Sequence, residues 1–270
     1  MEESAGITIY SQLSCPTSYR LYKRLRDEKL LDRVSIVDTG LSPFESLYRG
    51  VISVPAIFYG GIMIYSGYFD IDEAVGVISG GGPPVIRNFD YGEASVLAME
   101  GILDSYATAL WVYLTENIES PLSQRPFIEA VSRHVFYEGR SGESYEKLAR
   151  AVRSLYEEEK SLYRERLREI VARNIMREII WLGRDPGTTR ERLDREYIEH
   201  ILLARASIGR IGLIMGYPLK PHMERVKELY RFLRESWEEI YEKVLRETRK
   251  ILGDREYVED YISRVSRRNL

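Results

Sequence analysis

A single cysteine stands where a predicted strand ends and a predicted helix begins, and this arrangement constrains the fold more than any other feature. The apolar run Ile7–Tyr10 predicts the strand, and a helix is expected from Pro16 to about Leu30. Pro16 suits the first helical position, because its missing N–H would be unpaired there anyway. Cys15 therefore faces free backbone N–H groups and the positive end of the helix dipole, which favour thiolate over thiol. The sequence predicts a nucleophile at Cys15.

The cysteine content sets further limits on this chemistry. Cys15 is the only cysteine of the chain, so no internal disulfide can form and any thiol exchange uses one protein thiol. A lone cysteine also has a structural interpretation, as a small buried apolar residue. The order of strand, Cys15-Pro16 and helix favours the reactive interpretation, and the structural one stays open.

Length and charge narrow the class of protein. At 270 residues the chain suits two domains better than one. A net charge of -3 gives no electrostatic case for nucleic acid or an anionic membrane as a partner. The longest apolar run, Ile208–Leu219, is shorter than the about 18 residues of a membrane span and contains Arg210.

The first residues and the residue usage predict the setting in which the protein works. Residues 1–6 are acidic and lack the basic and apolar regions of a secretory signal, and with one cysteine this favours a cytoplasmic, reducing location. Charged residues make up 30% of the chain, with Arg and Glu plentiful, which is compatible with a thermophilic source.

Strand and helix patterns alternate after the first helix. Val34–Asp38 predicts a second strand, parallel to the first because a helix connects the two. A short helix is expected from Ser42-Pro43 to Gly50. Two apolar runs around Gly60-Gly61 then predict a β-hairpin.

Two further signals stand on either side of this hairpin. Proline is confined to the start of a strand or to a special turn, so Val54-Pro55 is predicted as a cis peptide bond. Asp70 or Asp72 is expected to cap a helix that runs to about Ile78.

This order of elements over residues 6–80 resembles the thioredoxin fold, and within it the glutaredoxins and the amino-terminal domains of glutathione transferases. Three segments carry the resemblance: Tyr10-Ser11 with Cys15–Ser18, then Ser53–Phe58, then Gly67–Asp70. The resemblance implies catalysis by Cys15 and Ser18, with glutathione or another low-molecular-weight thiol as co-substrate. It implies that this thiol is bound by Pro16, Thr17, Val54, Pro55, Gly67, Tyr68, Phe69 and Asp70.

The sequence departs from the family pattern at several positions. Ser18 stands where a second cysteine is common, so exchange would be monothiol. Gln12 replaces a frequent lysine, which weakens the case for binding a glutathione carboxylate, and Ser66 replaces one glycine of a usual pair. The Cys-Gly-Phe-Ser form of the cluster-handling glutaredoxins is missing, which disfavours an iron–sulfur cluster.

The sharpest change of composition is Ser79–Pro84, with three glycines and two prolines. The sequence therefore predicts a thioredoxin-like α/β domain over residues 1–80, a Gly/Pro linker over 81–91 and an all-α domain over 92–270. This order is similar to the glutathione transferase architecture, with an enlarged helical domain. Trp181–Thr188 resembles the turn before that family's central helix.

Helical periodicity dominates the second half of the chain. The expected helices cover residues 96–114, 127–136, 143–182 with a break near Glu157–Glu159, 189–216 with a capping box from Thr188 to Glu191, a stripe from Pro221 to Leu245, and a short helix after Gly253-Asp254. The three histidines lack metal-ligand spacing, so no metal is expected.

The sequence thus predicts a monothiol transferase or thiol–disulfide oxidoreductase whose substrate is a disulfide or an electrophile. Two alternatives stay open: a conjugating enzyme like the glutathione transferases, and a non-catalytic binding or scaffold protein. The oligomeric state, a homodimer included, stays open as well.

Overall fold

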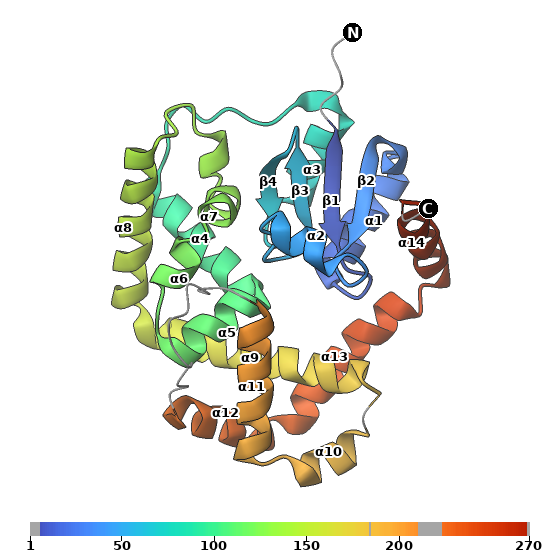
Figure 1. The fold of residues 1–270 in the computed structure, drawn as a ribbon, viewed down its shortest axis with the longest axis vertical. Coiled ribbons are helices and arrows are strands. Elements are labelled where there is room, and N and C mark those ends of the chain that lie inside the picture. Colours follow the sequence, from blue (N-terminus) through green and yellow to red (C-terminus); the bar gives the residue numbers. More distant parts are fainter. Residues whose placement is uncertain (1–5, 184, 210–222, 269–270) are drawn as a thin grey trace. The chain divides into compact units, whose positions relative to one another are not determined.

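The computed structural model describes residues 6–183, 185–209 and 223–268 (Figure 1). Its first part contains β1 (Ile7–Ser11), α1 (Pro16–Asp27), β2 (Val34–Asp38), α2 (Pro43–Tyr48), β3 (Ala56–Tyr59), β4 (Ile62–Ser66) and α3 (Ile71–Gly76). The helices that follow are α4 (Tyr91–Asp104), α5 (Tyr106–Thr115), α6 (Glu119–Leu122), α7 (Arg125–Val131), α8 (Gly142–Glu158), α9 (Lys160–Trp181), α10 (Pro186–Arg192), α11 (Arg195–Gly209), α12 (Met223–Glu235), α13 (Trp237–Leu252) and α14 (Arg255–Arg268).

The four strands form one mixed sheet in the order β2-β1-β3-β4. β1 and β2 are parallel, whereas β1 pairs with β3, and β3 with β4, in antiparallel fashion. This confirms the parallel first pair and the hairpin around Gly60-Gly61. A mixed sheet followed by many helices is compatible with the predicted thioredoxin-like domain and helical region.

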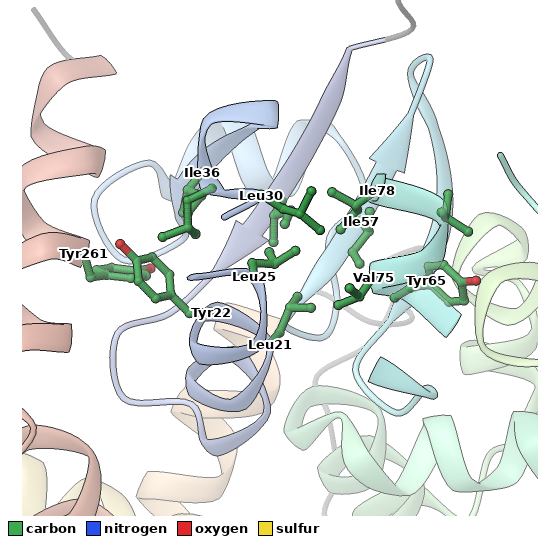
Figure 2. Close-up of a cluster of buried hydrophobic side chains, with 14 of the residues drawn as sticks. Leu21, Tyr22, Leu25, Leu30, Ile36, Ile57, Tyr65, Val75, Ile78 and Tyr261 are labelled. Carbon is green, nitrogen blue, oxygen red and sulfur yellow. The ribbon is translucent and has the colours of Figure 1, made fainter. Parts of the chain in front are cut away.

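Successive strand side chains point to opposite faces of the sheet, and both faces carry buried residues. One face, carrying Ile9 and Ile57, packs against Leu21 and Leu25 of α1 and Val75 of α3 (Figure 2). The opposite face packs in a second cluster that includes Ala130 of α7. Residues from the far end of the chain join the first cluster: Ile251, Tyr257, Tyr261 and Val265.

The chain divides into two compact units, each discontinuous in sequence. The unit of the sheet comprises the chain up to Gly101, then Gln124–Leu155 and the segment from Lys250. The second unit comprises Ile102–Ser123 and Tyr156–Arg249 and is helical. The C-terminal helix α14 therefore belongs to the unit of the sheet. The boundaries predicted from composition, 1–80, 81–91 and 92–270, stay a prediction.

Two of the expected helices do not continue as predicted. The prediction of one helix over 96–114 is wrong, because Ser105 breaks it into α4 and α5 and caps the latter by accepting a hydrogen bond from the Thr108 N–H. The helix expected over 127–136 is α7 alone, followed by a single 3-10 turn, His134–Phe136. The break predicted near Glu157–Glu159 is confirmed, since α8 ends at Glu158 and α9 starts at Lys160.

The predicted capping box at Thr188 is also wrong. Asp185 caps α10, its side chain accepting from the Thr188 N–H, because Pro186 then occupies the first helical position. The helix expected over 189–216 is α10 and α11, and its end beyond residue 209 lies outside the described residues, as does Pro221. The stripe that follows is divided between α12 and α13.

A membrane span was not expected, and none is found in the described ranges: no helix there is both long and apolar enough to cross a bilayer. The short helix predicted after Gly253-Asp254 is present as α14. Figure 1 shows α14 next to β2, at the edge of the sheet.

Candidate functional site

Cys15 lies between the end of β1 and the start of α1, and it is half-buried. Its backbone is extended, and its side chain caps the helix: Sγ accepts a hydrogen bond from the Ser18 N–H at 3.5 Å. The Cys15 N–H in turn donates to the Gln12 carbonyl at 3.0 Å, which closes a turn. The sulfur is therefore placed against a helix N-terminus, where the backbone stabilises negative charge.

The Val54-Pro55 peptide bond is cis, as predicted, and Val54 meets Cys15. The Cys15 thiol donates to the Val54 carbonyl at 3.4 Å. The proline loop is held to β4, because the Gly67 N–H donates to the Pro55 carbonyl at 2.8 Å. The first two segments of the resemblance thus lie against each other in space, and the loop of the third is tied to the second.

The contacts of the sulfur with Ser18 and Val54 act in opposite directions. The Ser18 N–H stabilises the thiolate, whereas the Val54 carbonyl accepts the thiol proton and stabilises the neutral form. A bound peptide group that takes over the Val54 carbonyl would remove the second effect.

Ser18 contributes its backbone to this contact, whereas its hydroxyl lies elsewhere. The side chain is buried, and its oxygen is 3.5 Å from the Gln12 N–H, from which it accepts. Pro16 and Thr17 are half-buried in the first turn, and the Thr17 hydroxyl accepts from Arg20 at 3.4 Å. A catalytic role for the Ser18 hydroxyl stays a prediction.

The Gly67–Asp70 segment turns the chain from β4 into α3. Gly67 adopts a φ of 60°, which glycine takes without strain. Phe69 packs against Tyr65 with ring centroids 5.1 Å apart, and Tyr68 is exposed. Asp70 is the helix cap, since its Oδ1 accepts from the N–H groups of Asp72 and Glu73 at 2.8 and 3.2 Å. Ligand binding by these residues stays a prediction.

Asp38, at the end of β2, supports the site, although the sequence pattern identifies it only as the last residue of a strand. It is buried, and its Oδ2 accepts from the Leu13 N–H at 3.2 Å and from the Tyr261 hydroxyl at 2.7 Å. Its Oδ1 accepts from the N–H groups of Gly40 and Leu41 at 2.8 and 3.1 Å. One buried carboxylate therefore organises the loops that follow both β1 and β2.

Helix α14 brings three more groups to this end of the sheet. The Tyr257 hydroxyl donates to the Leu13 carbonyl at 2.9 Å, and the Tyr261 hydroxyl lies 2.7 Å from Ser11 Oγ. Tyr22 of α1 donates to Asp260 at 2.7 Å. Burial is the main cause that raises the pKa of both Tyr257 and Tyr261 above 10, so these hydroxyls stay protonated. From the sequence only a short helix is expected here; the four-residue spacing of Tyr257, Tyr261 and Val265 is the signal that could have indicated a buried stripe, although not its partner.

Asp254 ties the start of α14 to α1. Its Oδ2 is 2.8 Å from Lys23 Nζ and 2.8 Å from the Tyr19 hydroxyl, and its Oδ1 accepts from the Tyr257 N–H at 3.1 Å. The hydrogen bond from Lys23, with those from Tyr257 and Tyr19, lowers the pKa of Asp254 to about 2. Because folding lowers the pKa of Asp254, its ionised carboxylate stabilises the folded protein above the ordinary pKa near 4. This stabilisation disappears as the pH falls toward 2.

The pairing of Asp254 predicts a specific pH dependence. An Asp254→Asn variant should unfold at lower urea concentration than the wild type above about pH 4, since Asn cannot form the ion pair. The difference between the two proteins should shrink as the pH falls to about 2, where the wild-type carboxylate takes up a proton. Urea midpoints followed by far-UV circular dichroism at several pH values measure it. A difference that stays constant down to about pH 2 would contradict this assignment.

A second polar cluster, which the sequence did not predict, lies elsewhere in the unit of the sheet. Buried His134 has Nε2 2.9 Å from Ser144 Oγ and Nδ1 3.3 Å from Glu129, although the latter contact lacks hydrogen-bond alignment. Burial raises the pKa of Glu129, but His134, Arg125 and Arg140 more than offset this and keep it below its ordinary value.

Ser144, His134 and Glu129 follow one another as the serine, histidine and carboxylate of a hydrolase triad do. The surroundings of the serine, however, differ from those of a nucleophile. Ser144 is buried, and its oxygen accepts from the Ser141 N–H at 2.8 Å while Ser141 Oγ accepts from the Ser144 N–H at 3.1 Å. This reciprocal pair caps α8, so the Ser144 hydroxyl is a structural group. In the described part of the chain, no three His, Cys, Asp or Glu side chains are grouped as metal ligands.

Comparison of the chain with protein-family models, with curated proteins and with solved structures finds no match. The fold shown is a mixed sheet with a helical region. A closer assignment depends on the residues around Cys15.

Proposed function

We propose that this chain is a monothiol transferase with a thioredoxin-like domain, which acts through Cys15 on disulfides with a small thiol as co-substrate. The observation that carries the proposal is the position of Cys15 Sγ, between the Ser18 N–H at a helix start and the carbonyl of Val54 beside cis Pro55. The strand order and the parallel β1–β2 pair support the thioredoxin-like assignment.

The reaction needs one protein thiol and no external oxidant. Cys15 thiolate attacks one sulfur of a disulfide R–S–S–R′, which forms the mixed disulfide Cys15–S–S–R and releases R′–S⁻, which takes up a proton. A second small thiolate then attacks the sulfur that carries R in the mixed disulfide. The Cys15 thiolate is restored, and R leaves in a new disulfide. The Ser18 N–H stabilises the thiolate at the beginning and at the end of this cycle.

The co-substrate is a thiol with a peptide-like backbone, glutathione or a related compound. Val54 offers its carbonyl beside the sulfur, and among the hydrogen bonds of the described residues none involves the Val54 N–H. An amino group of the ligand would pair with the exposed carboxylate of Asp70, next to Gly67, Tyr68 and Phe69. Gln12 supplies no charge for a ligand carboxylate, so a related peptide-like thiol fits as well as glutathione does. A reducing cytoplasm would keep this thiol available.

The test uses the fact that Cys15 is the only thiol of the chain. The folded protein is alkylated with iodoacetamide across the pH range, and separately treated with glutathione disulfide and weighed by mass spectrometry. We expect alkylation with a midpoint below the about 8.5 of a free thiol and an adduct of one glutathione that excess thiol removes. A Cys15 that stays unreactive while the protein is folded overturns the proposal and favours the scaffold alternative.

A conjugating enzyme, the alternative function, is distinguished from a thiol transferase by the product that it forms. Incubation with glutathione and 1-chloro-2,4-dinitrobenzene gives a thioether faster than without protein if the chain is a conjugating enzyme. A thiol transferase does not accelerate this reaction, because it acts only when a disulfide is supplied. Conjugation that persists after Cys15 is alkylated would contradict the proposed role of this residue.

A further inference from the structure

The peptide groups of Leu13, two residues before Cys15, are held from both sides. The Leu13 N–H donates to Asp38 Oδ2 at 3.2 Å, and the Leu13 carbonyl accepts from the Tyr257 hydroxyl at 2.9 Å. These partners are 25 and 244 residues away in the sequence. The segment between β1 and Cys15 therefore takes its position from β2 and from the C-terminal helix.

Helix α14 also orders the Asp38 side of this arrangement. The Tyr261 hydroxyl donates to Asp38, because a carboxylate only accepts, and Ser11 Oγ must then donate to Tyr261 at 2.7 Å. Ser11 is the last residue of β1. Figure 2 shows Tyr261 reaching from α14 to the edge of the core beside Tyr22.

The sulfur depends on this segment for its own contacts. Its distances to the Ser18 N–H and the Val54 carbonyl are 3.5 and 3.4 Å, so a small movement of residues 12–15 changes the balance between thiolate and thiol. Misplacement of a reacting group by about 1 Å is enough to slow a reaction strongly. The hydroxyls of Tyr257 and Tyr261 are neutral, directional donors in a buried setting, which suits them to fix a peptide orientation.

We propose that Tyr257 and Tyr261 of α14 are positioning residues for Cys15, so that the reactivity of the thiol depends on the docked C-terminal helix. This inference rests on the proposed function, since it assigns a role at the same site. Tyr257 acts directly on the Leu13 carbonyl, and Tyr261 acts through Asp38 and Ser11. Neither hydroxyl takes part in the exchange itself.

The deciding comparison is Tyr257→Phe against Tyr22→Phe. Both substitutions remove the hydroxyl of a buried tyrosine that links α14 to the rest of the unit, but the hydroxyl of Tyr22 binds Asp260 and does not touch the Cys15 segment. The measurement is the iodoacetamide alkylation rate of Cys15 across the pH range, with urea midpoints of each variant recorded alongside. Tyr257→Phe is expected to lower the rate at pH 7 about three- to tenfold and to move the midpoint to higher pH.

Tyr22→Phe is expected to lose stability without a change in the alkylation profile. Equal profiles of the two variants would overturn the inference, as would an unchanged profile in Tyr257→Phe. If Tyr257→Phe does not fold, Tyr261→Phe replaces it and is expected to shift the profile in the same direction. Alkylation needs no disulfide substrate, so a wild type that forms no glutathione adduct defeats the proposed function, whereas equal variant profiles remove only the positioning role.

Discussion

Replacing Cys15 by serine is expected to abolish thiol transfer, with the rate of disulfide exchange falling about a thousandfold or more. The chain has no other thiol to take over the reaction, and a serine hydroxyl stays protonated where a thiol at a helix start ionises. Reduction of 2-hydroxyethyl disulfide in the presence of glutathione, corrected for the reaction without protein, measures the effect. The fold should be retained, because Ser also caps helices well.

A matched control separates chemistry from folding. Ser35 lies exposed on β2 in the same sheet, and Ser35→Ala should exchange disulfides at the wild-type rate. Wild type that has been alkylated on Cys15 should behave like Cys15→Ser. Exchange at an undiminished rate in Cys15→Ser would exclude Cys15 as the nucleophile, and the binding or scaffold alternative would then gain support.

The parts of the fold that the sequence predicts are those with strong local signals. Gly60-Gly61 between two apolar runs predicts the hairpin, because two glycines adopt the positive φ angles that such a turn requires. Val54-Pro55 predicts the cis bond, since proline alone makes cis and trans comparable in energy. The parallel first pair follows from the helical connection between Ser11 and Val34.

Errors arise where two local signals compete for a helix start. Asp185 and Thr188 both have side chains that cap helices, and Pro186 decides in favour of Asp185 because it fits the first helical position. Ser105 interrupts an apolar stripe that continues on both sides, so the periodicity hides the break between α4 and α5. Periodicity reports a buried face, and it does not report where the backbone hydrogen bonds change partners.

The candidate site also has features that the sequence predicts and features that it does not. Proximity of Cys15 and Val54 follows from the resemblance, and the structure places them together. The contacts of Tyr257 and Tyr261 join residues more than two hundred positions apart, and no pattern near Cys15 announces them. A stripe of aromatic residues on a C-terminal helix is compatible with many packing partners, so only the folded chain identifies Leu13 and Asp38.

Asp38 is expected to be the most sensitive polar residue for stability in the unit of the sheet. Asp38→Ala would leave four donors without their acceptor: the N–H groups of Leu13, Gly40 and Leu41 and the hydroxyl of Tyr261. Because Asp38 and Tyr261 are buried, water replaces the lost bonds only in part. We expect the free energy of unfolding to fall by about 3–5 kcal/mol, in urea denaturation followed by far-UV circular dichroism.

The exposed Asp72 provides the matched control for this prediction. Its ion pair with Arg24 spans 3.0 Å at the surface and is screened by water, so Asp72→Ala should leave the urea midpoint close to that of the wild type. Amide hydrogen exchange of β1 tests whether the loss of stability lies in the sheet. Exchange should accelerate in Asp38→Ala but not in Asp72→Ala. Equal losses of stability in the two variants would show that Asp38 stabilises the sheet no more than an exposed carboxylate does. A large loss confined to Asp38→Ala, with slower alkylation of Cys15, would show that one carboxylate couples the stability of the sheet to the reactivity of the thiol.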